Sequence, residues 1–420
     1  MSTASHLIEW KTNAWKDPAM VSWYSQRMVV NQGTNRLKNR LEVDACLAYA
    51  TGEEVLDVGI GTGRGSLPLL ARGQRVTGVD SSQAMLDECQ RLASQAGLGL
   101  HTQTSQLDCL PFTAGSFDSL ISLNVLMHFP HWKQILPEWK RVVRPGGRLV
   151  FDVHSLDHYR AALGRPVAEE ELLQTEAATY TLRMAAEDLL AEADRHGLAV
   201  HALVPYGAFL GGGNRNYLLG TLEDKAFWAR LLSFLATDEA LFGFALFIEQ
   251  ELVARLTTTV TGRLMVVLDN RADRAGNQAW LADNRRLEAA LRQTPIELEA
   301  VAARLGSSLS ALRERAGGYL AHSLRSVRLL ECLAGPLVAK GRLGWSDLLA
   351  APAAAQLAEL ATRRAEDRLA SELSRRLPHE PEAVAQRLDF EGVPLGAGLE
   401  YLLVERLLTR GLGRFTGVRS

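Results

Sequence analysis

The segment VLDVGIGTGRG, residues 55–65, constrains the fold of this 420-residue chain more than any other stretch. Its first residues favour a buried strand, and its four glycines at every second position favour a tight turn that lets the backbone approach a ligand. Asp57 stands two residues before the first glycine. A strand, a glycine turn and a helix in this order are typical of α/β folds that bind nucleosides. We therefore expect a ligand site at this turn.

Strand-like and helical segments alternate on both sides of this turn. The strand-like segments are 54–59, 75–80, 98–105, 117–124 and 147–154, and the helical segments between them are 64–72, 82–95 and 131–144. Each helical segment is long enough for a crossover between parallel strands. Segments 196–207 and 262–270 read as a sixth and a seventh strand. If these two pair side by side, the chain forms an α/β fold with a doubly wound, seven-stranded, mostly parallel sheet.

The remaining segments suggest three domains. Residues 1–45 are predicted to form a helical lid, in which Asp17 caps a helix that begins at Pro18. The sheet and its helices occupy residues 46–275, and residues 280–420 carry no strand pattern and are predicted to be helical. Residues 296–320 within it have helix-turn-helix spacing, but the second helix of that segment offers only Arg313 and Arg315 for phosphate contacts. A dimer contact or a cover over the substrate is the favoured interpretation, which leaves a homodimer open.

Composition restricts the partners. The 46 basic and 48 acidic side chains nearly cancel, which disfavours a nucleic-acid partner. The four cysteines lie far apart without the spacing of metal ligands, so no metal is expected. The chain contains no apolar run of about 18 residues, the length that crosses a membrane. We expect a cytoplasmic protein that acts on a small molecule.

The glycine spacing discriminates between two cofactor classes. A dinucleotide site needs GxGxxG, but Arg64 and Ser66 occupy the two positions where the third glycine would fall. The alternating Gly59, Gly61 and Gly63 after Asp57 instead resemble the first motif of class I S-adenosylmethionine-dependent methyltransferases. Residues 106–132 and 136–153 are similar to later strands and turns of the small-molecule branch of this family. The resemblance covers about residues 50–155 and implies a Rossmann-like methyltransferase fold with S-adenosyl-L-methionine as cofactor.

The resemblance also implies roles for individual residues. Asp57 is expected to hold the methionine amino end, and the backbone of the glycine turn to lie against the sugar and the methionine. Asp80, followed by Ser81, is expected to accept hydrogen bonds from both ribose hydroxyls. The alternative for Asp80 is to cap helix 82–95, a role that Ser81 or Ser82 fills as well.

Gln106 and Leu107 are expected at the adenine. Many family members carry Asp where this chain has Gln106, whose amide oxygen accepts the same hydrogen bond without a charge, and Asp108 is the alternative acceptor. Asn124 either lines the methionine pocket or caps the turn after its strand.

Two histidines follow strands at the edge where ligands bind in such sheets. His154 ends segment 147–154 and is the predicted general base, with a position in a solvated loop as the alternative. His128 is a second candidate base, with packing or capping as the alternative. The expected reaction is methyl transfer to oxygen or nitrogen of a small molecule, either a specialised metabolite or a modified peptide. A transferase that moves another group of the cofactor, and a non-catalytic regulatory protein that binds it, are the alternatives.

Overall fold

The structure is a computed structural model. It describes residues 13, 15–28, 35–163, 166–167, 182–207, 242, 246, 249–250, 253–255, 257–259 and 261–293. The predicted helical region beyond Gln293 lies outside the described residues.

The chain divides into two compact units. The first comprises residues 1–157, 167–204 and 263–281 and contains almost the whole sheet. The second comprises residues 158–166, 205–262 and 282–420. Within the second unit the Nδ1 atom of the buried His158 lies 2.7 Å from the backbone oxygen of Thr259. The domain boundaries expected from the sequence stay predictions.

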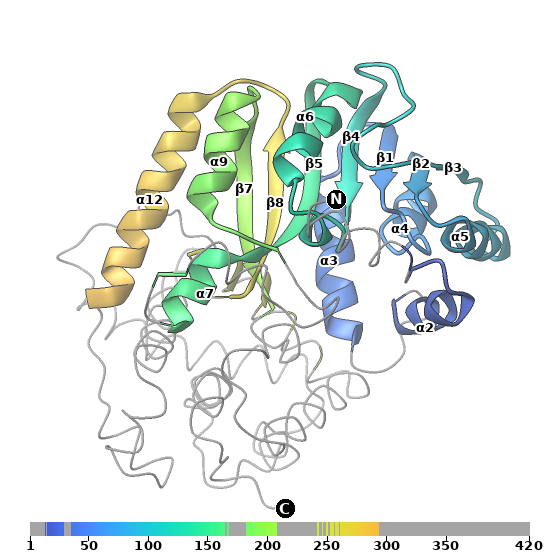
Figure 1. Ribbon diagram of the computed structural model, residues 1–420, viewed down its shortest axis with the longest axis horizontal. Coiled ribbons are helices and arrows are strands. Elements are labelled where there is room, and N and C mark those ends of the chain that lie inside the picture. The colour runs from blue at the N-terminus through green and yellow to red at the C-terminus, as the bar shows by residue number, and fades with distance from the viewer. Residues whose placement is uncertain are drawn as a thin grey trace, which may run out of the picture. The chain divides into compact units, whose positions relative to one another are not determined.

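An eight-stranded mixed sheet organises the fold (Figure 1). The strands are β1 Glu54–Val58, β2 Arg75–Asp80, β3 His101–Thr104, β4 Phe117–Ser122, β5 Val143–Ser155, β6 Arg183–Met184, β7 Ala199–Tyr206 and β8 Arg263–Asp269. The order is β3-β2-β1-β4-β5-β8-β7, and the short β6 pairs with β5. β8 runs antiparallel to β5 and lies beside β7, which confirms the predicted pairing of the last two long strands. The predicted doubly wound α/β sheet is confirmed, with the two-residue β6 as an addition.

The helices follow local sequence signals. They are α2 Pro18–Met28, α3 Arg36–Tyr49, α4 Ser66–Ala71, α5 Gln83–Gln95, α6 Trp132–Val142, α7 Leu156–Leu163, α9 Ala186–Arg195 and α12 Arg274–Gln293, with 3-10 turns η2 Leu126–His128 and η5 Val253–Arg255. Asp17 caps α2 as predicted, because its Oδ1 accepts from the Ala19 amide at 2.8 Å. α2 packs against α5, as Figure 1 shows. None of the helices in the described part of the chain is long and apolar enough to cross a bilayer.

The core lies between the sheet and its helices. α6 buries Trp132, Ile135, Leu136, Trp139 and Val142, a spacing that gives one apolar face against the sheet. The Trp139 ring meets Phe151 of β5 edge to face, with 5.6 Å between the centroids. All seven residues of β8 are buried, as expected of an interior strand.

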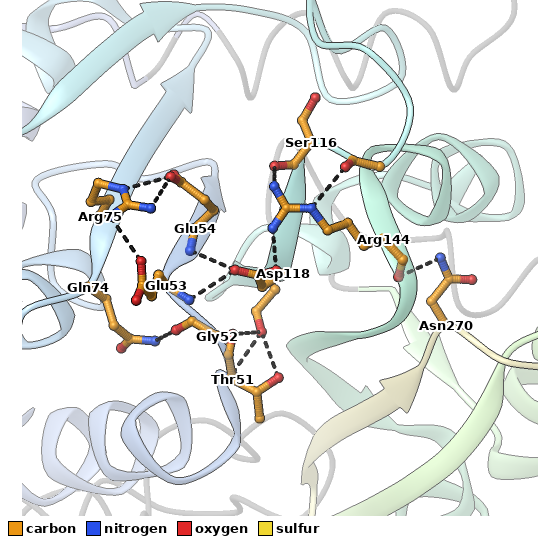
Figure 2. A network of polar contacts seen from close by, with 12 residues as sticks. Thr51, Gly52, Glu53, Glu54, Gln74, Arg75, Ser116, Asp118, Arg144 and Asn270 are labelled. Carbon is orange, nitrogen blue, oxygen red and sulfur yellow. Dashed lines mark hydrogen bonds and ion pairs between the residues drawn. The ribbon is translucent and has the colours of Figure 1, made fainter.

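A polar network joins the strands at the amino edge of the sheet (Figure 2). Asp118 at the start of β4 accepts from the amides of Glu53 and Glu54, both at 2.9 Å, and pairs with Arg144 of β5. Asn270, just after β8, donates to the backbone oxygens of Val143 at 2.8 Å and Arg144 at 3.1 Å. β5 begins at Val143, which pairs with Phe117 of β4, whereas the sequence suggested a strand from residue 147. The network fixes the strands at the end away from the glycine turn.

Candidate cofactor site

A cavity of about 370 Å³ opens at the carboxyl edge of the sheet, where the strand order reverses between β1 and β4. Residues after β1, β2 and β4 line it together with residues of α2 and α3 and the first residue of β8. The lining residues are Trp15, Trp23, Tyr24, Met28, Lys38, Gly59, Gly61, Asp80, Ser81, Met85, Gln106, Leu107, Leu123, Asn124, Val125, Met127, His128, Phe129 and Arg263. Within the described part of the chain no cluster of His, Cys, Asp or Glu is arranged to hold a metal.

The glycine turn is anchored to Asp80. Gly59 and Gly61 have φ angles of 70° and 54°, in the left-handed region that favours glycine. The Gly61 amide donates to Asp80 Oδ2 at 2.9 Å, and the Ser82 amide donates to Asp80 Oδ1 at 2.9 Å. Ser82 is the residue that caps α5, because its Oγ accepts from the Met85 amide at 3.3 Å. Asp80 therefore lines the cavity without being needed as the helix cap.

Asp57 lies beneath the turn instead of in the cavity wall. Its side chain is buried, and its Oδ2 accepts from Ser66 Oγ at 2.6 Å. Burial raises the pKa of Asp57 to about 7, against the hydrogen bond from Ser66. Gly63 is likewise absent from the cavity lining. The predicted contact between Asp57 and the methionine amino group stays a prediction.

The residues predicted to contact the adenine line the cavity. Ser81, Gln106 and Leu107 line the cavity beside Met85. The side chain of Asp108 is 51% exposed and faces His131 at 3.9 Å, outside the cavity lining. Of the two candidate acceptors for the adenine amino group, Gln106 is therefore the one that the fold brings to the cavity.

The two candidate histidines differ in position. His128, in η2, lines the cavity. His154 is only 5% exposed, does not belong to the lining, and its Nε2 atom has no hydrogen-bond partner among the described residues. Burial and the nearby Arg263 cation hold the pKa of His154 well below its usual range, so its ring is neutral at pH 7. The fold thus places His154 one layer behind the cavity wall.

Sequence reasoning missed a buried group of charged residues around Asn124. We call this group the Asn124 cluster; it consists of Asn124, Lys38, Glu42, Arg64, Asp152 and Arg263. Asn124 has a φ of 60°, an uncommon value for a residue other than glycine. Its Oδ1 accepts from Lys38 Nζ at 2.6 Å and from Arg263 Nη1 at 3.3 Å. Its Nδ2 donates to Glu42 Oε2 at 3.2 Å, and its amide donates to Asp152 Oδ1.

The cations of the Asn124 cluster keep the Glu42 carboxyl group ionised. Glu42 is fully buried and pairs with the Arg64 guanidinium, which is 4% exposed. Burial acts to raise the pKa of Glu42, but the Arg64, Lys38 and Arg263 cations outweigh it and hold this pKa well below its usual range. The pair connects α3 to the glycine turn, and so couples the N-terminal helices to the cavity.

The cavity suits S-adenosylmethionine. The Asp80 carboxylate is an acceptor for ribose hydroxyls, and the apolar Met85 and Leu107 suit the faces of an adenine. A side chain at Gly61 would point toward Tyr24, whose Cε1 lies 3.5 Å from the ideal Cβ position. The absence of a side chain there lets a ligand pass between the turn and α2.

Comparison with known proteins agrees with this fit. Residues 56–151 match a family described as a methyltransferase domain. This segment of the chain is therefore a class I S-adenosylmethionine-dependent methyltransferase domain, and S-adenosylmethionine is its cofactor.

Individual relatives are similar over part of their length. The O-methyltransferase resE of Aspergillus sclerotiorum is 33% identical over 147 residues, which cover 34% of this chain and 52% of that protein. A ubiquinone biosynthesis O-methyltransferase of Coxiella burnetii is 34% identical over 100 residues, which cover 24% of this chain and 43% of that protein. The chain thus spans about half the length of these curated relatives.

A solved structure of a possible histamine N-methyltransferase from Thermotoga maritima is 19% identical to this chain. The match covers 45% of this chain and 82% of that chain, with a TM-score of 0.35. A similarity this low supports no conclusion about this chain.

Proposed function

We propose that this protein transfers the methyl group of S-adenosylmethionine to an oxygen or a nitrogen of a small molecule, a specialised metabolite or a modified peptide. The observation that carries the proposal is the cavity in which Asp80, the glycine turn and the aromatic residues of α2 meet. The relatives named as O-methyltransferases favour oxygen over nitrogen.

The chain's own residues have two tasks in this reaction. S-adenosylmethionine, when bound, supplies a methyl group on a sulfonium, which is already an activated electrophile. Asp80 holds the ribose and the cavity lining aligns the acceptor, while Trp15, Trp23 and Tyr24 exclude water. His128 is the cavity residue suited to take the proton from the acceptor near neutral pH.

Product analysis tests the reaction type. The protein is incubated with S-adenosylmethionine labelled in the methyl group and a panel of phenols, amines and carboxylates. Release of S-adenosylhomocysteine with label in the acceptor supports the proposal. Release of methylthioadenosine indicates aminopropyl transfer instead, and binding without turnover over the whole panel indicates a regulatory protein.

Replacement of the two histidines separates the candidate bases. Because His128 lines the cavity and His154 does not, we expect His128→Ala to reduce turnover by about 10² to 10⁴ and His154→Ala to reduce it less. Affinity for S-adenosylmethionine should change little in either variant. His131→Ala, on a histidine outside the cavity lining, is the matched control. A larger loss in His154→Ala would make His154 the base, as the sequence suggested.

A further inference from the structure

One end of the cavity is cationic. Lys38 and Arg263 both line the wall there and both donate to the Oδ1 atom of Asn124. Among the described residues that line the cavity, Asp80 is the only one with a carboxylate. Asp80 is hydrogen-bonded to the glycine turn and to the start of α5, in another part of the wall.

The carboxylates that balance these cations lie behind the wall. Glu42 and Asp152 are 0% and 1% exposed, and Arg263 Nη1 lies 3.9 Å from Glu42 Oε1 and 3.6 Å from Asp152 Oδ2. Glu42 is also the partner of the buried Arg64. The Asn124 cluster thus sets three cations against two carboxylates. Asp57 is a third buried carboxyl group near Arg64, and burial raises its pKa to about 7. Below pH 7 an anion in the cavity would therefore offset the excess positive charge of the cluster, because buried charges are stable when paired.

Asn124 holds the two cations toward the cavity. Its positive φ is an uncommon conformation that surrounding contacts must maintain, and such residues gather at ligand sites. The conformation is fixed by the hydrogen bond from the Asn124 amide to Asp152. The amide oxygen of the side chain then orients the Lys38 ammonium and the Arg263 guanidinium side by side. Two adjacent cationic donors match the two oxygens of a carboxylate.

We propose that Lys38 and Arg263 form a carboxylate-binding subsite at the Asn124 end of the cavity. The carboxylate comes either from the methionine part of the cofactor or from the acceptor. The inference rests on S-adenosylmethionine as the cofactor and is independent of which group the enzyme transfers.

The proton on Lys38 gives the subsite a pH dependence. Burial is the main cause that lowers the pKa of Lys38 to about 7; the Glu42 and Asp152 carboxylates act to raise this pKa, and the Arg263 and Arg64 cations act to lower it. A bound carboxylate favours the protonated ammonium. Carboxylate affinity should therefore be highest below pH 7 and fall as Lys38 loses its proton above pH 7. His154 is neutral over this range, whereas Asp57 titrates near it, so a variant at Lys38 must isolate the effect.

The test uses the full chain and calorimetry with three probes. These are S-adenosylhomocysteine, which carries a carboxylate, 5′-methylthioadenosine, which lacks the amino-acid part, and sodium benzoate added to the protein saturated with S-adenosylhomocysteine. The variants are Lys38→Met and Arg263→Met, with Lys38→Arg as the charge-retaining variant and Lys133→Met on the exposed side of α6 as control. Titrations at pH 6.5 and 8.5 measure the pH dependence.

Two outcomes support the subsite and identify the source. If Lys38→Met lowers affinity for S-adenosylhomocysteine by about tenfold or more and spares methylthioadenosine, the carboxylate belongs to the cofactor. If both nucleosides bind normally but benzoate binding is lost, the carboxylate belongs to the acceptor. In either case Lys38→Arg binds the carboxylate as the parent does. The loss of affinity between pH 6.5 and 8.5 disappears in both Lys38→Met and Lys38→Arg.

The remaining outcomes overturn the proposal. Equal losses for S-adenosylhomocysteine and methylthioadenosine, no loss for any probe, or failure of Lys38→Arg to restore binding would each show that the charge of Lys38 does not bind a carboxylate. If Arg263→Met fails to fold, Lys38→Met decides alone. Failure of methyl transfer in the product assay leaves these titrations interpretable, because they measure binding only.

Discussion

Replacing Glu42 with Gln should lower the free energy of unfolding by about 3–5 kcal/mol, the range for removing one partner of a buried ion pair. The variant leaves the Arg64 guanidinium, which is 4% exposed, without its carboxylate partner. Lys38 and Arg263 lose the same countercharge. Urea unfolding, followed by circular dichroism, measures the change.

Asp44→Asn is the matched control, because Arg40 and Asp44 form an ion pair on the same helix, α3. The Arg40 side chain is 54% exposed, and pairs of this kind contribute about 0–1 kcal/mol. A Glu42→Gln variant as stable as Asp44→Asn would show that the Asn124 cluster does not hold α3 to the glycine turn.

Replacing Gly61 with Val should reduce affinity for S-adenosylmethionine by more than about 200-fold, beyond the range of roughly 1.5–3 kcal/mol for one lost charge-assisted hydrogen bond. The φ of 54° disfavours a β-branched residue, and the side chain would fill the space between the turn and Tyr24. The Gly61 amide would also lose its alignment with Asp80. Calorimetric titration with S-adenosylmethionine gives the affinity.

Gly99→Val is the control for replacing a glycine with a valine. A Cβ at Gly99 meets no atom within 4 Å, and the residue lies outside the cavity lining. We expect Gly99→Val to bind as the parent does. Parent-like affinity in Gly61→Val would remove the glycine turn from the cofactor site.

Local patterns predicted the sheet and part of the cavity wall. The strand–turn–helix order around residues 55–65 predicted the glycine turn, and the acid at the end of the next strand predicted Asp80 in the cavity wall. These signals are local because each lies within one strand and the turn that follows it. The contact of Gln106 and Leu107 with the cavity followed from the family resemblance in the same way.

The Asn124 cluster could not be predicted, because its members lie far apart in the sequence. Lys38 and Glu42 come from α3, Asp152 from β5 and Arg263 from the start of β8. They meet only because β8 runs antiparallel to β5, so that its first residue reaches the carboxyl edge of the parallel strands. No local sequence pattern predicts that these residues lie close together in the fold.

The sequence also could not predict which of the two histidines lines the cavity. The last seven residues of β5, which include His154, are all buried, so they show no alternation that would reveal which side chains face the cavity. His128 lies in η2 after β4, where the chain turns over the cavity. Which histidine takes the acceptor proton stays a prediction.

Titration of S-adenosylmethionine into the parent protein and into Asp80→Ala is the most direct test of the cofactor site. We expect saturable binding of one cofactor per parent chain, and an affinity lower by roughly 1.5–3 kcal/mol in the variant, the range for charge-assisted hydrogen bonds. Asp80→Asn, which keeps an oxygen acceptor for the Gly61 amide, should lose less. Equal affinity in the parent and Asp80→Ala, or no saturable binding in the parent, would contradict the assignment of this cavity to S-adenosylmethionine.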